Sequence, residues 1–528
     1  MLWIRSSTFP GNQDEDRTSV VPAEVRNPRM LQILGTARRV CSGLTRREML
    51  QAGALGLGGL SLSELLRITE AQTAPISAAT SFGRAKSCIL LYLYGSPSQL
   101  ETVDMKPDAP EEIRGEMKPI ASSLPGLQVC EYLPHMAKIM DRVTVVRSLT
   151  HPYPIHGVAH ALTGVPSIDV AMELSPNDPR HWPFFGSVIE YVDQQSRGGK
   201  PSGDIPRNIA LPWHFSSQRA GEVPRAGFAP AFLGSGFNPV WTDFQGTATR
   251  SMVKTLQNKQ ETIWDPYLGV TPESRFVLPG ASQLQPELTL DRLNQRRSLL
   301  DQFDDARLEL DQSRAGQSVD RYREMAFSIV NSEKVRKALD IQQEPTTVRE
   351  SYGMTVFGQA SLAARRLVEA GTRLVTVIWD EFGLAGSAWD THWDHYPKMK
   401  DELLPGLDKA FAGLVLDLEQ RGMLDETLVL CMSEHGRTPK LNRSVGGGRD
   451  HWSQCYSQWF AGGGIARGNV VGRSDKWAAT PVERPVSPKD ILATIYHLLG
   501  IDHRMTIVDR IGRPLPLVEG DVVQEMMG

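Results

Sequence analysis

Five residues with metal-binding side chains stand in three short segments of the chain: Asp390, His392, Glu434, His435 and His451. Imidazole nitrogen combined with carboxylate oxygen suits Zn, Mn or Fe, whereas carboxylate oxygen alone suits Mg or Ca. Adjacent side chains such as Glu434 and His435 diverge, so they can reach two neighbouring metals. Two metals about 4 Å apart would clamp the attacking and the leaving oxygen of an ester displacement. We therefore predict that these five residues bind divalent metal, with Zn, Mn, Ca and Mg all left open.

Other polar residues near these segments suggest how a substrate would be held. Arg437 lies two residues after the Glu-His pair, and its guanidinium can bind an anionic group through two parallel hydrogen bonds. We expect Asp394 and Asp450 to orient neighbouring side chains or to cap turns. The alternative for the whole set is a packed, hydrogen-bonded loop, because tryptophans flank His392.

A second group of histidines comprises His151, His156 and His160. His156 and His160 are four residues apart, so on a helix they would share one face, as in metal-binding helices. No Glu follows His156, so the HExxH pattern of zinc proteases is absent. We expect His156 and His160 to contribute to catalysis by contacting a substrate anion. A capped, solvent-facing helix start is an equally good interpretation.

The elements that position these residues alternate between strands and helices. Continuous apolar runs at 88–94, 374–379 and 428–432 are typical of buried strands, and 143–146 is a further candidate. Apolar residues at helical spacing precede the run at 374–379 and the run at 428–432. This alternation predicts an α/β fold with a mostly parallel central sheet covered by helices on both faces. Ligands bind beyond the carboxyl ends of such strands, so we expect the polar clusters to meet there.

The composition is that of a folded protein without a nucleic-acid partner. Of its 528 residues, 41% are hydrophobic and 22% are charged, which excludes general disorder. Lys and Arg number 57 and Asp and Glu number 61, so the net charge of -4 argues against binding nucleic acid through bulk charge. The five Cys show no CxxC spacing, which disfavours both a disulfide scaffold and a thiolate zinc site.

Residues 1–80 are expected to hold a disordered start and an export signal. Arg46 and Arg47 precede an apolar, Gly-rich run over 52–62, and the small residues at 71–74 suit a signal peptidase. This arginine pair resembles a twin-arginine signal, so we expect transfer by the twin-arginine export machinery and a periplasmic or extracellular location. The alternative is an amphipathic helix start with two surface arginines. No later stretch has 18 uninterrupted apolar residues, so we expect no transmembrane segment in the mature chain.

Residues 81–520 are expected to form one α/β domain with two insertions. The first, 196–285, is rich in Gly, Pro and Ser and has few periodic runs, so we expect long loops over the core. The second, 287–340, is polar with a partial apolar face, which is typical of a helical insertion.

Short motifs occur along the chain from the signal to about Gly520. They include Gly95-Ser96-Pro97-Ser98-Gln99-Leu100, Ile113-Arg114-Gly115, Trp389-Asp390-Thr391-His392, Glu434-His435-Gly436-Arg437-Thr438-Pro439 and Gly448-Arg449-Asp450-His451-Trp452. Together these motifs resemble the domain-of-unknown-function 1501 family. That family is placed in the alkaline-phosphatase and sulfatase superfamily. The resemblance therefore implies an alkaline-phosphatase-like fold and the metal-dependent hydrolysis of esters.

The same resemblance shows where this chain departs from its relatives. Glu434 stands where sulfatases carry an Asp metal ligand, and Glu101 stands where the family usually has Asp. No Cys or Ser lies in the segment just ahead of Thr163, where formylglycine sulfatases carry their nucleophile. A formylglycine mechanism is therefore not expected.

Other nucleophiles remain open. Ser96, Ser98 or Thr102, after the first predicted strand, could attack an ester, or a metal-activated water could do so. The leading hypothesis is an exported, metal-dependent hydrolase of phosphate or sulfate esters, acting on a small molecule or a polysaccharide. The rival is a non-catalytic ligand-binding or cell-envelope protein that kept the fold. A phosphomutase is a third option.

Overall fold

All described residues belong to one compact unit, residues 75–528. The computed structural model describes 81–528 without 154–155, 166–169, 177, 179, 200–204, 218–224, 247–250, 257–258, 265–268, 279–331, 381–387 and 510. The expected disordered start and export signal over 1–80 lie outside the described residues. So does most of the expected helical insertion over 287–340, whose described end contains α11 (Glu333–Leu339).

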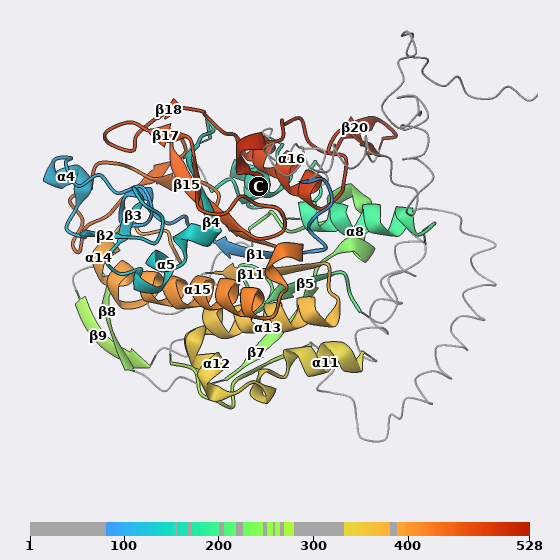
Figure 1. Cartoon of the computed structure of the whole chain (residues 1–528), viewed down its shortest axis with the longest axis horizontal. Coiled ribbons are helices and arrows are strands. Elements are labelled where there is room, and N and C mark those ends of the chain that lie inside the picture. The colour runs from blue at the N-terminus through green and yellow to red at the C-terminus, as the bar shows by residue number, and fades with distance from the viewer. Residues whose placement is uncertain are drawn as a thin grey trace, which may run out of the picture. The chain divides into compact units, whose positions relative to one another are not determined.

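An eight-stranded sheet forms the centre of this unit (Figure 1). Its strands lie in the order β16 (Asn469–Val471), β4 (Val143–Leu149), β15 (Tyr456–Ala461), β12 (Thr427–Met432), β1 (Ser87–Leu93), β11 (Leu374–Trp379), β5 (Asn208–Leu211) and β6 (Val240–Trp241). Neighbouring strands are parallel except at β15, which is antiparallel to both β4 and β12. The predicted α/β fold with a mostly parallel sheet is confirmed.

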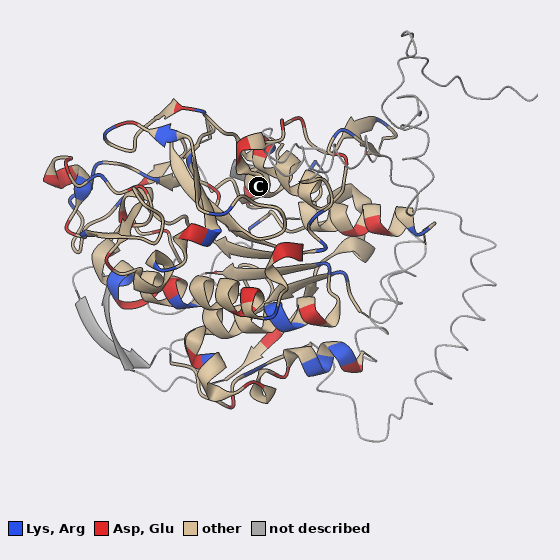
Figure 2. Ribbon diagram, in the orientation of Figure 1, with Lys and Arg blue, Asp and Glu red and all other residues tan. Residues whose placement is uncertain are grey.

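The apolar runs identified in the sequence form the central strands. Every residue of β1, β11 and β12 is buried, which explains why these strands are continuously apolar rather than alternating. In Figure 2 the strands β1 and β11 carry no charged residues, whereas helices and loops around them carry Lys, Arg, Asp and Glu. Residues 196–285 are not only loops, because β5 and β6 from this region extend the sheet.

Two long helices cover one side of the sheet (Figure 1): α13 (Val356–Ala370) and α15 (Leu404–Gln420). The Thr355 hydroxyl accepts a hydrogen bond from Gly358 N–H at the start of α13, and Gly371, at φ 112°, ends it in the left-handed region. Phe357 packs on Trp379 of β11 with ring centroids 4.6 Å apart. Burying side chains of this size stabilises the layer by about 1.5–3 kcal/mol each.

The opposite side carries α8 (Phe185–Ser196) and α16 (Pro488–Leu498) (Figure 1). A capping box starts α16, in which the Ser487 hydroxyl accepts from Asp490 N–H and the Asp490 carboxylate accepts from Ser487 N–H. The sheet is thus covered on both faces, as predicted.

Shorter elements complete the described unit. The short helices are α4 (Glu111–Arg114), α5 (Pro134–Ala137), α6 (Val158–Thr163), α7 (Val170–Glu173), α12 (Thr346–Ser351) and α14 (His395–Lys398). The two-stranded pairs are β2 (Pro119–Ala121) with β3 (Gln128–Cys130), β7 (Asp243–Gln245) with β10 (Arg275–Val277), β8 (Ser251–Leu256) with β9 (Lys259–Trp264), β13 (Gly436–Arg437) with β14 (His451–Trp452), β17 (Arg473–Ser474) with β18 (Pro481–Glu483), and β19 (Thr506–Val508) with β20 (Pro514–Pro516).

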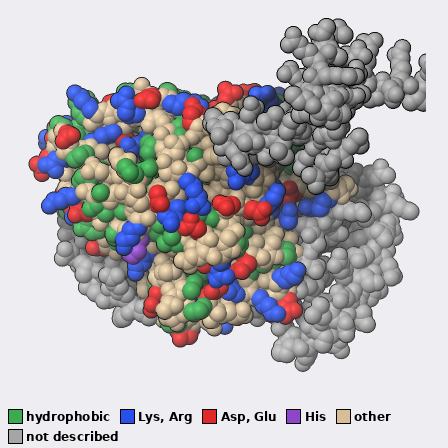
Figure 3. All heavy atoms as spheres, viewed as in Figure 1, with side chains coloured by type: hydrophobic (Ala, Val, Ile, Leu, Met, Phe, Trp, Pro, Cys, Tyr) green, Lys and Arg blue, Asp and Glu red, His purple; other side chains and the backbone are tan. Residues whose placement is uncertain are grey.

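The surface seen in Figure 3 mixes the two signs of charge. Lys and Arg alternate with Asp and Glu over the described part of this face, without a large area of one sign. Within the described residues, no helix is both long enough and apolar enough to cross a membrane.

One edge of the sheet gathers the polar segments. Because β4, β12, β1, β11 and β5 all run the same way, their carboxyl ends share this edge. The segments that follow β1, β4, β11 and β12 carry Ser96, His156, Asp390 and Glu434 respectively. The topology therefore brings these residues toward one place, as expected for an open parallel sheet.

Candidate metal centre

Four histidines and one carboxylate meet at this edge from four separate segments. His156 Nε2 lies 3.1 Å from Asp390 Oδ2, and His451 Nε2 lies 3.2 Å from Asp390 Oδ1. His392 Nε2 lies 3.0 Å from both Asp390 Oδ1 and His451 Nε2. Two groups have their ligand atoms within 4.8 Å of one another: His156, His435 and His451, and Asp390, His392 and His451. The structure thus joins four residues predicted as ligands with one predicted for catalysis.

In two of these imidazoles, Nδ1 contacts a carboxylate on the side of the ring away from the cluster. His156 Nδ1 lies 2.9 Å from Glu434 Oε1, and His392 Nδ1 lies 2.6 Å from Asp450 Oδ1. In each ring the opposite nitrogen, Nε2, points to the cluster. An acceptor on one ring nitrogen leaves the other nitrogen to bind metal, and carboxylate–histidine pairs of this kind orient metal ligands. The expectation that Asp450 orients a neighbour is confirmed.

His435 follows the same pattern with a backbone acceptor. Its Nδ1 lies 2.8 Å from the carbonyl oxygen of Gly436, while its Nε2 is buried and has no hydrogen-bond partner among the described residues. The ring centroid of His435 is 4.7 Å from that of His451 and 5.2 Å from that of His156. A buried polar atom without a partner is rare in folded proteins, and a ligand at this position would satisfy it.

Glu434 was predicted to bind metal, but its two oxygens are already engaged. Oε1 accepts from Gly95 N–H at 2.8 Å and lies against His156, and Oε2 accepts from the Tyr92 hydroxyl at 3.1 Å. The side chain is fully buried and belongs to neither group of candidate ligands. Burial alone would raise the pKa of Glu434, but the hydrogen bond and charge of His156 outweigh it and lower that pKa. Its carboxylate is thus placed to orient His156.

The ionisation of the cluster is divided among its members. Burial on its own lowers the pKa of His156, but hydrogen bonds to Asp390 and Glu434 outweigh it and raise the pKa to about 9. Burial lowers the pKa of His435 and of His451, and the positive charges nearby add to this effect. Near neutral pH and without metal, the His156 ring is therefore protonated on both nitrogens and positively charged, while the rings of His435 and His451 stay neutral.

Arg437 lies inside the centre. Its Nη1 is 2.7 Å from Asp390 Oδ1, and its Nε donates to the Ser96 carbonyl oxygen at 3.1 Å. Burial raises the pKa of Asp390, but the charge of Arg437 and the three imidazoles bring it well below its usual range. Arg437 Nη2 is buried without a hydrogen-bond partner among the described residues, so it keeps a donor for an anion.

The two serines proposed as nucleophiles differ in their contacts. Ser96 has a positive φ of 72°, and its Oγ accepts from His435 N–H at 3.0 Å. Ser98 is buried, and its Oγ has no hydrogen-bond partner among the described residues. Ser96 thus fixes the backbone of a candidate ligand, whereas the Ser98 hydroxyl is uncommitted.

The expectation that His156 and His160 share a helical face is wrong. The helix α6 starts only at Val158, after Gly157 with its φ of -77° and ψ of 55°, so His156 lies in the preceding loop. His160 lies in α6, and its ring centroid is 5.1 Å from that of His151. Burial lowers the pKa of His160 to about 4. His160 belongs to neither group of candidate ligands.

Sequence reasoning missed the residues that hold Glu434. Tyr92 sits inside an apolar strand, where its hydroxyl gives no sign of a polar role, and Gly95 contributes only its backbone N–H. Neither residue type carries a pattern that would have pointed to the centre.

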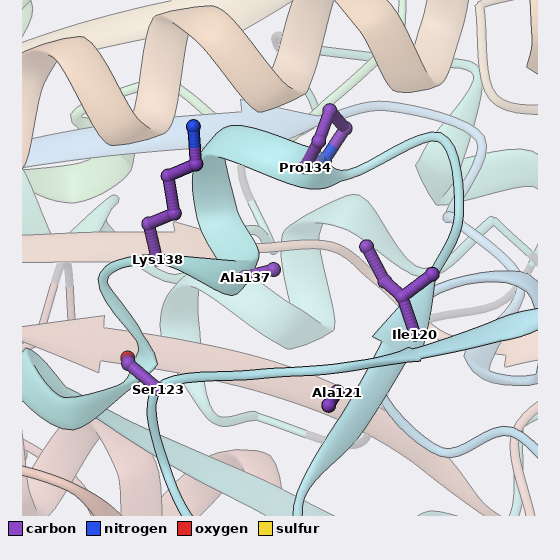
Figure 4. Close-up of a pocket in the computed structure, with 6 residues that line it drawn as sticks. All are labelled: Ile120, Ala121, Ser123, Pro134, Ala137 and Lys138. Carbon is purple, nitrogen blue, oxygen red and sulfur yellow. The ribbon is translucent and has the colours of Figure 1, made fainter.

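A surface pocket lies elsewhere, beside β2 and α5 (Figure 4). Its lining residues are Ile120, Ala121, Ser123, Pro134, Ala137 and Lys138. No residue of the metal centre lines it, so we assign it no part in the chemistry of the cluster.

Fold and site together define an α/β protein with an imidazole-rich group of candidate metal ligands at the carboxyl edge of its sheet. Among similar solved structures, one is described as the PsFucS1 sulfatase from Pseudoalteromonas sp., with 11% identity, coverage of 83% of this chain and 71% of that chain, and a TM-score of 0.34. Another is the phosphonate monoester hydrolase SpPMH from Silicibacter pomeroyi, with 12% identity, coverage of 83% and 76%, and a TM-score of 0.25. A third is Ps i-CgsB in complex with k-i-k-neocarrahexaose, with 12% identity, coverage of 79% and 72%, and a TM-score of 0.34.

The chain belongs to the family described as "Protein of unknown function (DUF1501)", whose model matches residues 85–527. The resemblance seen in the sequence motifs is thereby confirmed at family level. No curated protein matches the chain.

Proposed function

We propose that this chain is an exported, metal-dependent hydrolase of phosphate or sulfate esters. The observation that carries the proposal is the common orientation of three imidazoles: His156, His392 and His435 each have Nδ1 against an acceptor and Nε2 toward the cluster. This is the arrangement that prepares histidines for metal. The ester class follows from the family resemblance and from the anion donor on Arg437.

The donor set favours a transition metal over Ca or Mg. Imidazole nitrogens dominate both groups of ligand atoms, and once their protons are displaced such nitrogens suit Zn, Mn or Fe. Glu434, the carboxylate predicted to supply a harder ligand, is committed to its three donors. When bound, such a metal supplies Lewis-acid polarisation of the ester.

The residues of the chain would divide the remaining work. His435 and His451 present neutral rings, so they bind without first losing a proton. Arg437 Nη2 donates to a non-bridging oxygen of the ester, and the ion pair with Asp390 keeps the guanidinium in place. Ser98 is the better of the two serine nucleophiles, because the Ser96 oxygen already accepts from His435 N–H. Activated water remains the alternative to Ser98.

Export of the protein rests on the sequence alone. The paired arginines and the apolar run that follows them lie in residues 1–80, outside the described residues. Secretion of the folded chain, tested with a reporter fusion that carries either the arginine pair or two lysines, decides this part of the proposal.

Elemental analysis and turnover test the hydrolase. We expect the purified exported form to contain stoichiometric Zn, Mn or Fe and to hydrolyse an aryl phosphate or an aryl sulfate. H435A should lose both metal and turnover. The matched control is H497A, because His497 lies in α16 and belongs to neither group of candidate ligands. Wild-type protein that holds no metal and is inert toward both esters would refute the proposal and favour the non-catalytic binding protein.

A further inference from the structure

A buried cluster of four polar residues lies beside the metal centre: Glu101, Thr391, His395 and Arg449, here called the Glu101 cluster. Glu101 ends a short 3-10 helix after β1 (Gln99–Glu101), and neither its side chain nor that of Arg449 is exposed. Arg449 Nη2 and Nε donate to Glu101 Oε1 at 2.5 and 3.1 Å. His395 Nε2 lies 3.4 Å from Glu101 Oε2, and His395 Nδ1 lies 2.7 Å from Thr391 Oγ1.

Arg449 extends this cluster to the backbone around it. Its Nη1 donates to the carbonyl oxygens of Thr438, at 3.0 Å, and Pro439, and its Nη2 donates to that of Ile113 at 2.7 Å. Its own N–H donates to the Thr391 carbonyl oxygen at 3.1 Å. The guanidinium therefore crosslinks three separate stretches of chain, and the backbone N–H of Arg449 adds a fourth at Thr391.

The backbone of the motif Ile113-Arg114-Gly115 packs against the Glu101 cluster. In Ile113-Arg114-Gly115, the glycine has a φ of 68°, and a Cβ there would lie 2.1 Å from the Tyr396 hydroxyl oxygen and 3.1 Å from Glu101 Oε1. Only glycine lets the backbone pass this close. The motif thus wraps the Glu101 carboxylate rather than contributing a reactive group.

The Glu101 cluster adjoins the two segments that carry Asp390, His392 and His451. Thr391 stands between Asp390 and His392 in the chain, and Arg449 stands two residues before His451. The Arg449 carbonyl oxygen accepts from Arg437 Nη1 at 3.3 Å. No member of the cluster belongs to either group of candidate ligands.

We propose that Glu101 and Thr391 are positioning residues, which hold the segments carrying Asp390, His392 and His451 at the spacing that binds metal. The inference rests on the proposed function, because it presumes that these side chains take up a metal. Burial would raise the pKa of Glu101, but the charges of Arg449 and His395 lower it to about 2, so the carboxylate stays ionised at every working pH.

The test is the affinity of the full-length, metal-free protein for Zn, measured by competition with a chromophoric chelator. E101Q keeps the shape of the side chain and removes the charge that organises Arg449. T391V removes the partner of His395 Nδ1 and leaves the ion pair intact. Each variant is expected to weaken Zn binding by about 10–100-fold, the usual effect of losing an outer partner of a metal site.

A part-buried ion pair outside both groups of candidate ligands provides the control. Arg365 of α13, fully buried, pairs with Glu344 at 2.7 Å on the side of the sheet that α13 and α15 cover. E344Q is expected to lower the thermal midpoint of the metal-free protein, as E101Q does, while leaving Zn affinity within twofold of wild type. Stability and metal binding are thereby separated.

Three outcomes are informative. If wild type binds Zn and both variants bind it within twofold of wild type, the positioning role is wrong and the proposed function stands. If wild type binds no Zn, Mn or Fe, the proposed function fails and takes this inference with it. If E101Q does not fold, the Zn affinity of T391V alone tests the positioning role, because this variant breaks one hydrogen bond and leaves no buried charge unpaired.

Discussion

The affinity of the centre for metal should depend steeply on pH because of His156. Near pH 7 this residue carries a proton shared with Asp390 and Glu434, and a protonated imidazole cannot bind metal. Metal binding therefore has to displace that proton. The pKa of His156, raised to about 9 by its two carboxylate partners, sets the size of the effect.

The magnitude follows from the distance between pH 7 and that pKa. Displacing one proton lowers the apparent association constant about tenfold for each pH unit below the pKa. Two units separate pH 7 from a pKa of about 9, so binding at pH 7 should be on the order of 100-fold weaker than its limit at high pH. This corresponds to about 2.7 kcal/mol. His392, whose pKa is also raised by the hydrogen bond to Asp390, adds to the dependence in the same direction.

Calorimetry in two buffers of different ionisation enthalpy counts the released protons directly. We expect about one proton or more per Zn near pH 7.5, and a rise in affinity between pH 6.5 and 9. E434Q removes one carboxylate from His156, so its pKa should fall and the pH dependence should move to lower pH. A proton release near zero at pH 7.5, with flat affinity up to pH 9, would show that His156 is not protonated in the centre or is not a ligand.

Three further results are expected. The pKa of His156 is higher in the folded chain than its ordinary value of about 6.5, so its contribution to stability is complete below pH 6.5 and is lost as pH rises through about 9. The thermal midpoint of chelator-treated protein should therefore fall between pH 6.5 and 9, whereas that of metal-loaded protein should not. R437M removes the buried donor for an anion, so its kcat/KM for an aryl phosphate should be about 10–100-fold below that of wild type when both proteins hold the same amount of Zn. F357A opens a cavity against Trp379 and should lower the free energy of unfolding in urea by about 3–5 kcal/mol without changing the pH profile of metal binding.

The central strands could be predicted because burial on both faces leaves a plain signature. Residues 88–94, 374–379 and 428–432 are continuous apolar runs, and they form β1, β11 and β12. β15 escaped prediction, because its sequence Tyr-Ser-Gln-Trp-Phe-Ala mixes polar and apolar residues although all six are buried. Gln458 is satisfied there by donating to the Ser433 carbonyl oxygen, a contact that no local pattern announces.

The site could be predicted as a set of residue types, but not as a set of roles. Strand ends and residue chemistry were enough to select Asp390, His392, His435 and His451. They could not show that Glu434 accepts from Gly95 N–H, since these residues are 339 positions apart. For the same reason the sequence predicts that His156 contacts substrate, whereas the structure places its ring among the candidate metal ligands.

The charges of the inner centre explain why metal and anionic ester would be bound together. In the metal-free protein, Asp390 pairs with the guanidinium of Arg437, and both Asp390 and Glu434 pair with the protonated ring of His156. The formal charges of these four groups therefore sum to zero. Exchanging the proton for a divalent ion leaves one positive charge in excess, in a place where burial strengthens electrostatic attraction. Under the proposed function, the centre therefore attracts a phosphate or sulfate ester only after it has bound metal. Inorganic phosphate should accordingly bind the metal-loaded protein and not the chelator-treated one.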